Sequence, residues 1–346
     1  MTRQKLIGSA VAAALTLVVA QAAEAQETLV INSFGGAYEQ THRELVITPF
    51  EKANNVKVEV VTAYSADALA QLRAQKDNPK FDVVHFSGGL EHAAAAEGLL
   101  APIQPEELSN YGRMYSFAVK NMDKGIGPMY STAVMGLIYN SDQVKAAPTS
   151  WKDLENKAYA DHVLLTDAAS NTYGLLGFLM MNQVAGGSLE NIQPGLDLVK
   201  SLLPTSTIVS KSPEIQQNFA QGNAWIAPYA QDYAFTLTKA GLPVKFVQPK
   251  EGGVLAPITV NLVAGGKKRA LALKFIDFSI RAEASKGWAE ALRYTPTNKD
   301  AKLSDEVAAQ VVYGEDAVGK LVDFDANVIA KNRSAWNEAW SRAIAK

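Results

Sequence analysis

The sequence contains no cysteine, and this absence excludes disulfide bonds, thiolate metal sites and cysteine nucleophiles. Its charge is almost balanced: the 346 residues include 33 lysines and arginines and 35 aspartates and glutamates, which gives a formal net charge of −2. A balance this close to neutral argues against nucleic acid as a main partner. The only histidines, His42, His85, His92 and His162, are scattered without metal-ligand spacing. We therefore expect neither a metal nor a cofactor.

Motifs typical of exported enzymes are also missing. The chain has no G-x-S-x-G nucleophile elbow and no H-E-x-x-H helix. It has neither a P-loop nor a long G-x-G-x-x-G unit. We expect a protein without catalytic activity, and an exported hydrolase remains the less favoured alternative.

Long apolar runs are scarce, and the clear example lies at the N-terminus. Arg3 and Lys5 precede an apolar segment, 6–20, and an A-x-A cleavage site follows it and ends at Ala25. This order is that of a secretory signal peptide, and the apolar run is too short to span a membrane comfortably. The lack of a following cysteine excludes a lipoprotein. We expect a signal peptide over 1–25, cleavage after about Ala25, and a soluble mature chain in the periplasm.

The mature chain alternates strand and helix signals. Apolar, β-branched runs predict strands over 28–32, 57–61 and 81–86. Each is followed by a helical pattern, and Ser65 is the expected N-cap of the second helix. This alternation predicts an α/β fold with a parallel sheet, in which ligands bind beyond the carboxyl ends of the strands. Farther along we expect strands over 163–167, 224–229 and 244–247, and helices over 174–183, 194–203, 213–221, 231–240, 267–281 and within 304–345.

The stretch from Ile126 to Val144 is predicted to connect two lobes. It resembles two short apolar strands with almost no loop between them, and α/β-type sequence lies on both sides. Such a crossover places a hinge beneath a cleft, where small molecules bind. The alternative is a core strand in one large domain. With a return near 252–264, the expected lobes are 27–132 plus 258–300 (lobe one) and 133–257 plus 301–346 (lobe two).

Seven short motifs are spread over the mature chain: Phe81-Asp-Val-Val, Met135–Asn140, Thr149–Leu154, Leu164–Asp167, Gly241–Val244, Pro249–Gly253 and Tyr294–Asn298. Their order and spacing resemble the periplasmic solute-binding proteins of ABC importers, in the group that includes spermidine and putrescine binders. The resemblance implies a type II-like fold whose two lobes close on a hinge around a small-molecule ligand. It also implies delivery to an ABC permease in the inner membrane, with no chemistry. We expect the protein to be a monomer. A chemoreceptor is a further candidate partner, because proteins that dock on such receptors use the same fold.

The chain departs from the polyamine binders at the acids that hold the ligand's ammonium groups. Ala168 and Asn171 stand in the turn where two of those acids fall, and Ala256 and Ile258 stand near the third. Because burying an unpaired ammonium is costly, these replacements argue against spermidine and putrescine. Ferric-ion binders of the wider group use adjacent tyrosines, and the sequence has no Tyr-Tyr pair.

The side chains expected in the cleft are mostly neutral or aromatic. Hydroxyls and helix N-termini suit a carboxylate, phosphate or phosphonate, and aromatic walls offer packing and cation–π surface. We therefore hypothesise an amino-acid-like solute, an aminophosphonate or a carboxylate. A polyamine, with Asp232 as its acid, or thiamine is the alternative. The candidate residues are Phe34, Gly35, Gly36, Tyr38, Ser87, Tyr130, Ser131, Thr132, Ser170, Asn171, Thr172, Tyr173, Trp225, Tyr229, Asp232, Thr259, Asn261 and Tyr294.

Overall fold

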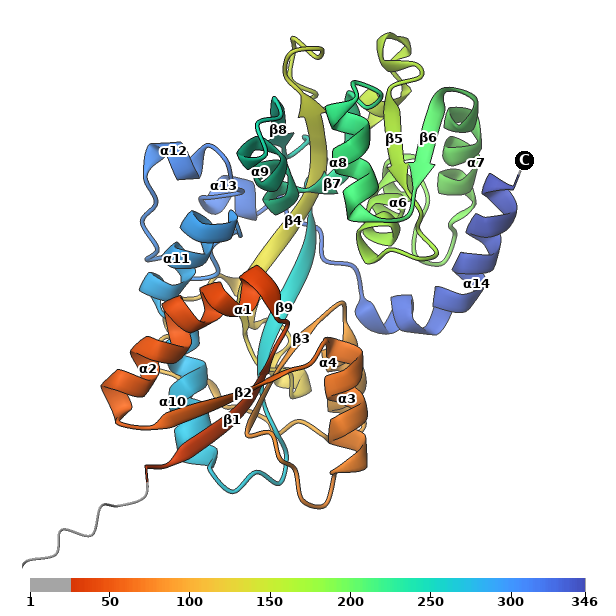
Figure 1. Ribbon diagram of the computed structural model, residues 1–346. Helices are drawn as coiled ribbons and strands as arrows, with labels where there is room; N and C mark the ends of the chain where they lie inside the picture. Colours follow the sequence, from red (N-terminus) through yellow and green to blue (C-terminus); the bar gives the residue numbers. More distant parts are fainter. Residues whose placement is uncertain (1–25, 346) are drawn as a thin grey trace, which may run out of the picture.

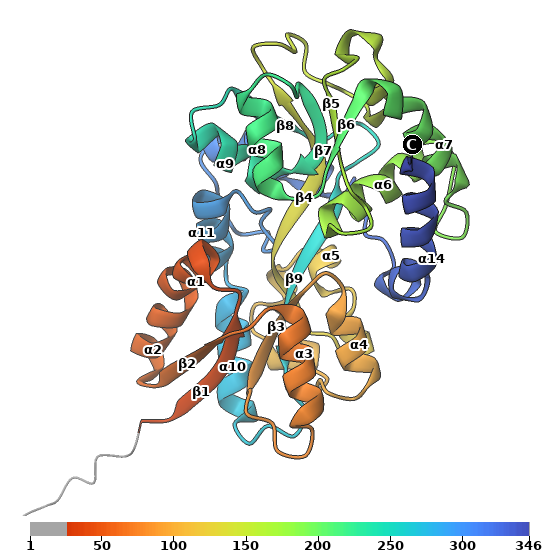
Figure 2. The same ribbon diagram turned by 45° about the vertical axis from the view of Figure 1, so that its right-hand side comes forward.

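Two α/β lobes, joined by a pair of long strands, make up the computed structural model, which describes residues 26–345 (Figures 1 and 2). The expected signal peptide, 1–25, lies outside the described residues. No helix within 26–345 combines the length and apolarity needed to cross a membrane.

Lobe one is built on three parallel strands in the order β2-β1-β3, as the alternating pattern predicts. Thr28 pairs with Lys57, and Ile31 pairs with Val83. Helix α1 leads directly into α2 through a short π-helical segment, 43–47. The elements are β1 (Thr28–Ser33), α1 (Gly36–His42), α2 (Thr48–Asn54), β2 (Lys57–Thr62), α3 (Ser65–Ala74), β3 (Val83–Ser87), α4 (Leu90–Ala96), α5 (Ser116–Val119), α10 (Arg269–Ser279) and α11 (Ala282–Leu292).

The crossover between the lobes is one strand, not two. The expectation of two short strands within 126–144 is wrong, because β4 (Met129–Asn140) runs unbroken for 12 residues and every one is buried. Gly136 does not interrupt it. A Cβ at Gly136 would lie 2.5 Å from the carbonyl oxygen of Val247, so glycine allows strand β8 to approach β4 closely.

The chain returns to lobe one along β9 (Val254–Leu262), which pairs antiparallel with both β4 and β3. Strands β4 and β9 thus join the sheets of the two lobes into one path, β2-β1-β3-β9-β4-β7-β5-β6, with β8 beside β4. In Figure 1 these two strands form the only sheet connection drawn between the lower and upper lobes. This arrangement agrees with the predicted hinge, since two strands can bend together while each lobe keeps its own layers.

Lobe two carries its own strands and helices, most of them as predicted. The missed strand, β6, is a four-residue segment without apolar alternation. The elements are β5 (Val163–Thr166), α6 (Thr172–Val184), α7 (Gln193–Leu202), β6 (Ser206–Val209), α8 (Ser212–Ala220), β7 (Ile226–Ala230), α9 (Gln231–Lys239) and β8 (Val244–Val247). Short 3-10 turns occur at 105–107, 111–113, 122–124, 151–155, 157–159 and 203–205.

The C-terminal helix contacts both lobes. After α12 (Asp305–Ala308) and α13 (Glu315–Val318), helix α14 (Ala326–Ile344) begins against α4 of lobe one, where Ala326 lies beside Gly89. It ends on lobe two, where it packs on α7 and the Trp340 ring meets the Phe178 ring edge to face at 5.2 Å. Helix α14 therefore runs past the space between the lobes (Figure 2).

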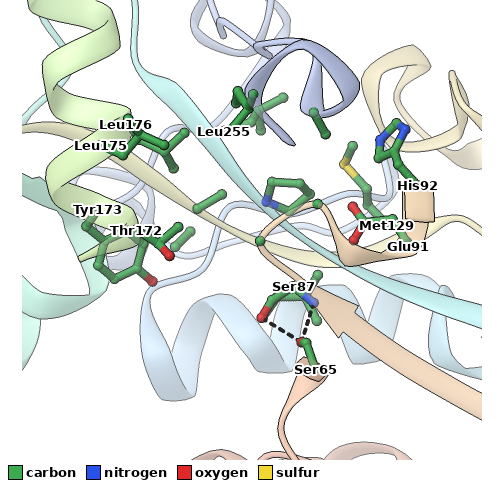
Figure 3. Close-up of a pocket in the computed structure, with 18 of the residues that line it drawn as sticks. Ser65, Ser87, Glu91, His92, Met129, Thr172, Tyr173, Leu175, Leu176 and Leu255 are labelled. Carbon is green, nitrogen blue, oxygen red and sulfur yellow. Dashed lines mark hydrogen bonds between the residues drawn. The ribbon is translucent and has the colours of Figure 1, made fainter. Parts of the chain in front are cut away.

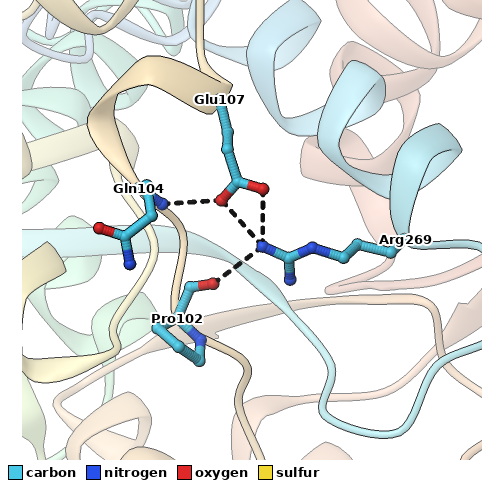
Figure 4. A network of polar contacts seen from close by, with 4 residues as sticks. All are labelled: Pro102, Gln104, Glu107 and Arg269. Carbon is cyan, nitrogen blue, oxygen red and sulfur yellow. Dashed lines mark hydrogen bonds and ion pairs between the residues drawn. The ribbon is translucent and has the colours of Figure 1, made fainter.

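A polar network joins the start of α10 to the segment 102–107 of lobe one (Figure 4). Arg269, at the start of α10, donates to both carboxylate oxygens of Glu107 at 2.8 Å and to the carbonyl of Pro102 at 3.2 Å. The backbone N–H of Gln104 and the Arg269 guanidinium lower the pKa of the Glu107 carboxyl. Because both side chains remain partly exposed, we expect a contribution of at most about 1 kcal/mol.

The hinge glycine supplies a stability prediction. Gly136→Ala places a methyl group against the Val247 carbonyl and the Phe246 ring, and we expect it to lower the free energy of unfolding by about 1–3 kcal/mol. Gly112→Ala is the matched control, because its Cβ meets no atom within 4 Å. Urea unfolding of the three proteins measures the difference. Equal losses in both variants would contradict the close packing of β8 on β4.

Candidate ligand-binding site

A cavity of about 630 Å³ lies between the lobes. Lobe one contributes the loops that follow β1, β2 and β3, and lobe two contributes the start of α6 (Figure 3). Further parts of the wall come from residues 255–258 of β9, from Met129 and Ala133 of β4, from the start of α4, from 121 and 323–324, and from one face of α14. The loops converge because the carboxyl ends of parallel strands lie at one edge of a sheet, as the sequence predicts.

Two of these loops are held together by serines, and here one expectation is wrong. Ser65 is not the N-cap of α3, since Tyr64 occupies that position and no side chain caps the helix. The Ser65 hydroxyl oxygen instead accepts the backbone N–H of Ser87 at 2.9 Å, and the two hydroxyls lie 3.2 Å apart (Figure 3). Ser65, the first residue of α3, therefore fixes the β3 loop at the cavity and does not cap its own helix.

Seven candidate residues line the cavity, and they come from both lobes. The rings of Phe34, Tyr38 and Tyr294 form an aromatic wall, in which the Phe34 and Tyr38 ring centroids lie 5.1 Å apart. Thr172 and Tyr173 face them from the first turn of α6. Ligand contact by these residues stays a prediction. The seven are Phe34, Gly35, Tyr38, Ser87, Thr172, Tyr173 and Tyr294.

The candidates on the two hinge strands lie outside the cavity lining. They are wholly buried within the sheet, where an unbroken apolar run gives no sign of which face each side chain takes. Asn261 shows the structural use of such a position: its side-chain oxygen accepts the N–H of Gly127 at 2.8 Å, and its amide donates to the carbonyl of Val84. The hinge-strand candidates are Tyr130, Ser131, Thr132, Thr259 and Asn261.

The lobe-two candidates outside the lining are held by local contacts. Asn171 caps α6 by accepting the N–H groups of Tyr173 and Gly174, and Ser170 donates to Asp167. The Trp225 ring stacks on the His162 ring, with the two ring centroids 3.8 Å apart. Tyr229 shares a hydrogen bond of 2.7 Å with Ser212. Gly36 and Asp232 also lie outside the lining. Burial raises the pKa of Tyr173 and of Tyr294, and the nearby Asp232 carboxyl adds to the rise.

Arg333 lines the cavity, and no pattern in the sequence predicts this position for it. Ala326, Ile329 and Arg333 occupy positions i, i+3 and i+7 of α14 and share its cavity face. Arg333 is half-buried, and burial lowers its pKa. No carboxylate of residues 26–345 forms an ion pair with it. The cavity wall therefore presents a cation without a countercharge among these residues.

Acidic side chains at the cavity were also missed. Glu91, on the first turn of α4, is 2% exposed, and burial raises the pKa of its carboxyl to about 7. Asp323 lines the cavity too, but Lys120 pairs with it at 2.7 Å. Asp232, which is a predicted candidate and lies outside the lining, also has its pKa raised by burial, to about 6. Only the fold reveals Glu91, because one glutamate in an alanine-rich helix indicates ordinary surface.

The sequence spacing suggests four scattered histidines, but two of them are in contact. His42 and His85 meet edge to face, with ring centroids 4.9 Å apart, and the Tyr38 ring lies 6.2 Å from that of His42. Both are wholly buried, and burial lowers the pKa of His85 to about 4 and that of His42 well below its usual value. His92 lines the cavity, and His162 stacks on Trp225. Residues 26–345 contain no group of three or more histidine, cysteine, aspartate or glutamate side chains suited to a metal ion.

Two α/β lobes, two shared hinge strands and a cavity lined from both lobes define a protein that binds a solute between its lobes. The sequence profile described as bacterial extracellular solute-binding protein matches residues 46–313. The chain belongs to this family, as its motifs predict. Proteins of the family bind small solutes outside the cytoplasm, and those of ABC importers deliver them to a permease.

Comparisons with individual proteins agree with this assignment. The chain is 27% identical over 283 residues to the spermidine/putrescine-binding periplasmic protein of Escherichia coli, covering 79% of this chain and 80% of that protein. It is 25% identical over 303 residues to the gamma-aminobutyric acid-binding protein of Pseudomonas aeruginosa, covering 82% and 81%. The crystal structure of an ABC transporter protein from Clostridium perfringens superposes with a TM-score of 0.81 at 23% identity, covering 92% of this chain and 100% of that one.

Proposed function

We propose that the protein captures a small solute with at least one acidic group and passes it to an ABC permease in the inner membrane. Arg333 carries this proposal, because it lines the cavity and forms no ion pair with a carboxylate of residues 26–345. A half-buried cation loses part of its hydration, and this loss is unfavourable when no partner replaces it. The planar guanidinium matches the oxygens of a carboxylate or phosphonate. An amino-acid-like solute, an aminophosphonate or a carboxylate would supply the missing charge.

Polyamine binding is the alternative that the name of the Escherichia coli relative favours. Two positions near the third polyamine acid, Ala256 and Ile258, line the cavity without a charge. An uncompensated Arg333 would also repel a polycation. Asp232 remains the acid that could hold an ammonium group of a polyamine or of thiamine. The name of the Pseudomonas aeruginosa relative, a gamma-aminobutyric acid-binding protein, favours the amino-acid-like solute.

The remaining expectations belong to the same proposal. The lobes would be 27–132 plus 258–300 and 133–257 plus 301–346, and they would close on β4 and β9 around the ligand. The 18 candidate residues would contribute to that closed site or support it. The mature protein would start after about Ala25 as a catalytically inactive periplasmic monomer, and a chemoreceptor would be a second partner. The N-terminal mass of the exported protein tests the cleavage site.

A ligand panel tests the proposed function. We expect carboxylates, phosphonates or amino acids to raise the melting temperature of the mature protein without being turned over. A ligand at 100 times its dissociation constant adds roughly 2.7 kcal/mol of stability. Spermidine, putrescine and thiamine are the contrasting arm of the panel. Sub-micromolar spermidine binding, measured by calorimetry, with no response to any acid would overturn the proposal in favour of a polyamine binder.

A further inference from the structure

One oxygen of the buried Glu91 carboxylate, Oε2, lacks a hydrogen-bond partner among residues 26–345, although the backbone N–H groups of Glu91 and Gly89 act on the carboxylate and oppose the rise in its pKa. Glu91 is 2% exposed and lines the cavity, where Figure 3 shows it beside His92 and Met129. Its Oε2 atom accepts no hydrogen bond from any residue of 26–345. A buried carboxylate oxygen without a donor is unfavourable and calls for an explanation. A cation brought by the ligand would satisfy it.

The protein's own cations near Glu91 are occupied elsewhere. Lys120 pairs with Asp323 at 2.7 Å, and Lys124 donates to the side chain of Asn121 at 3.2 Å. His92, on the same helix, is held toward its neutral form because burial lowers its pKa. Asp325 faces His92 from the segment before α14, and Asp323 adds negative charge beside Glu91. The cavity lining here therefore contains two acids, Glu91 and Asp323, and one oxygen of Glu91 lacks a partner among residues 26–345.

Glu91 and Arg333 lie at different points along one wall. Helix α4 meets α14 where Ala326 lies against Gly89, two residues before Glu91. Arg333 follows Ala326 by seven residues on the same face of α14, which corresponds to about 10 Å of helix rise. Arg333 and the free oxygen of Glu91 have opposite charge, and they form no ion pair within 4.0 Å of each other. With the offset along α14, this absence places the two groups apart along the cavity.

We propose that Glu91 receives a cationic amine of the solute while Arg333 holds its acidic group. The substrate class is then the extended zwitterions, in which several bonds separate the amine from the acid, such as ω-amino acids and aminoalkylphosphonates. An α-amino acid carries both charges on adjacent carbons and cannot reach two separated anchors. This inference rests on the proposed function, because it takes Arg333 as the contact of the acidic group.

Titration calorimetry of the mature protein tests the pairing. The probes are gamma-aminobutyrate, delta-aminovalerate and epsilon-aminohexanoate, each compared with the same acid lacking the amine and with its α-amino isomer. We expect the best ω-amino acid to bind at least about tenfold more tightly than both comparators. Glu91→Gln should abolish most of this preference, because the amine loses its charged partner. Glu106→Gln, at an exposed position, is the matched control.

Proton release supplies an independent measurement. The pKa of Glu91 is about 7 in the unliganded protein, so an arriving amine should displace the proton from roughly half of the molecules at pH 7. The binding enthalpy should then depend on the ionisation enthalpy of the buffer, and Glu91→Gln should remove this dependence. Melting of the unliganded variant checks its fold.

The two proposals fail in distinguishable ways. Binding of amine-free acids as tightly as ω-amino acids, or tighter binding of α-amino isomers, would overturn the role of Glu91 and leave an acid-binding protein. An unchanged preference in Glu91→Gln would do the same. Failure of every acid to bind would instead remove the proposed function itself.

Discussion

Replacing Arg333 with glutamine should weaken binding of the acidic solute about 30- to 100-fold, because a charge-assisted hydrogen-bonded pair in a half-buried site is worth about 2–3 kcal/mol. Arg333→Lys should lose less, since it keeps the charge but not the planar fork. The expected change lies mainly in the dissociation rate, because truncating a buried charge partner acts after the encounter. Calorimetry and stopped-flow fluorescence of the mature protein measure the two quantities.

A second arginine on the same helix provides the control. Arg342 lies two and a half turns farther along α14, is exposed and pairs with Glu338 at 3.7 Å. Arg342→Gln should leave the affinity within about a factor of two. If Arg342→Gln weakened binding as much as Arg333→Gln, the effect would come from the general charge of α14. In that case Arg333 would have no special position in the cavity.

The cavity edge of lobe one could be predicted from the sequence because it follows from local patterns. Phe34, Gly35 and Ser87 directly follow predicted strands, and parallel strands bring such positions to one edge of the sheet. Thr172 and Tyr173 were found for the same reason in lobe two, at the start of a helix that follows a strand. These residues needed no knowledge of how the lobes meet.

The hinge and the far wall of the cavity depend on packing that local sequence does not encode. All 12 residues of β4 are buried, so its apolar run could not show that Met129 lines the cavity and Tyr130 does not. Arg333 reaches the cavity because Trp340 packs on Phe178 and Ala326 packs on Gly89, at opposite ends of α14. Such distant contacts leave no periodic trace.

Two glycines lie where neighbouring elements pack closely. Gly136 indicates a strand that bends or lies beside another backbone, and the approach of β8 confirms the second of these. Gly287 lies inside α11, a helix that was not predicted, where a Cβ would come within 2.4 Å of the Leu45 side chain. In both cases glycine allows two elements to pack closely and does not end either of them.

The buried histidine pair should make the protein sensitive to acid. The folded-state pKa values of His42 and His85 lie below that of an exposed histidine, about 6.5. Below that pH the unfolded chain binds protons that the folded chain does not, so stability falls with falling pH. For His85, whose folded pKa is about 4, the loss is complete near pH 4 and amounts to about 3 kcal/mol. The raised pKa values of Glu91 and Asp232 act in the opposite direction, so a variant must isolate the histidine contribution.

His42→Phe isolates that contribution with little change of shape. Neither ring nitrogen of His42 has a hydrogen-bond partner within residues 26–345, and its neighbours include the rings of Tyr130, Phe275 and Trp288. Phenylalanine should fit this aromatic site and leave no group to titrate. We expect the slope of unfolding free energy against pH, measured by urea unfolding between pH 4 and pH 6.5, to decrease by up to about 1.4 kcal/mol per pH unit. An unchanged slope in His42→Phe would mean that His42 takes up its proton without unfolding, and the buried pair would then not limit stability in acid.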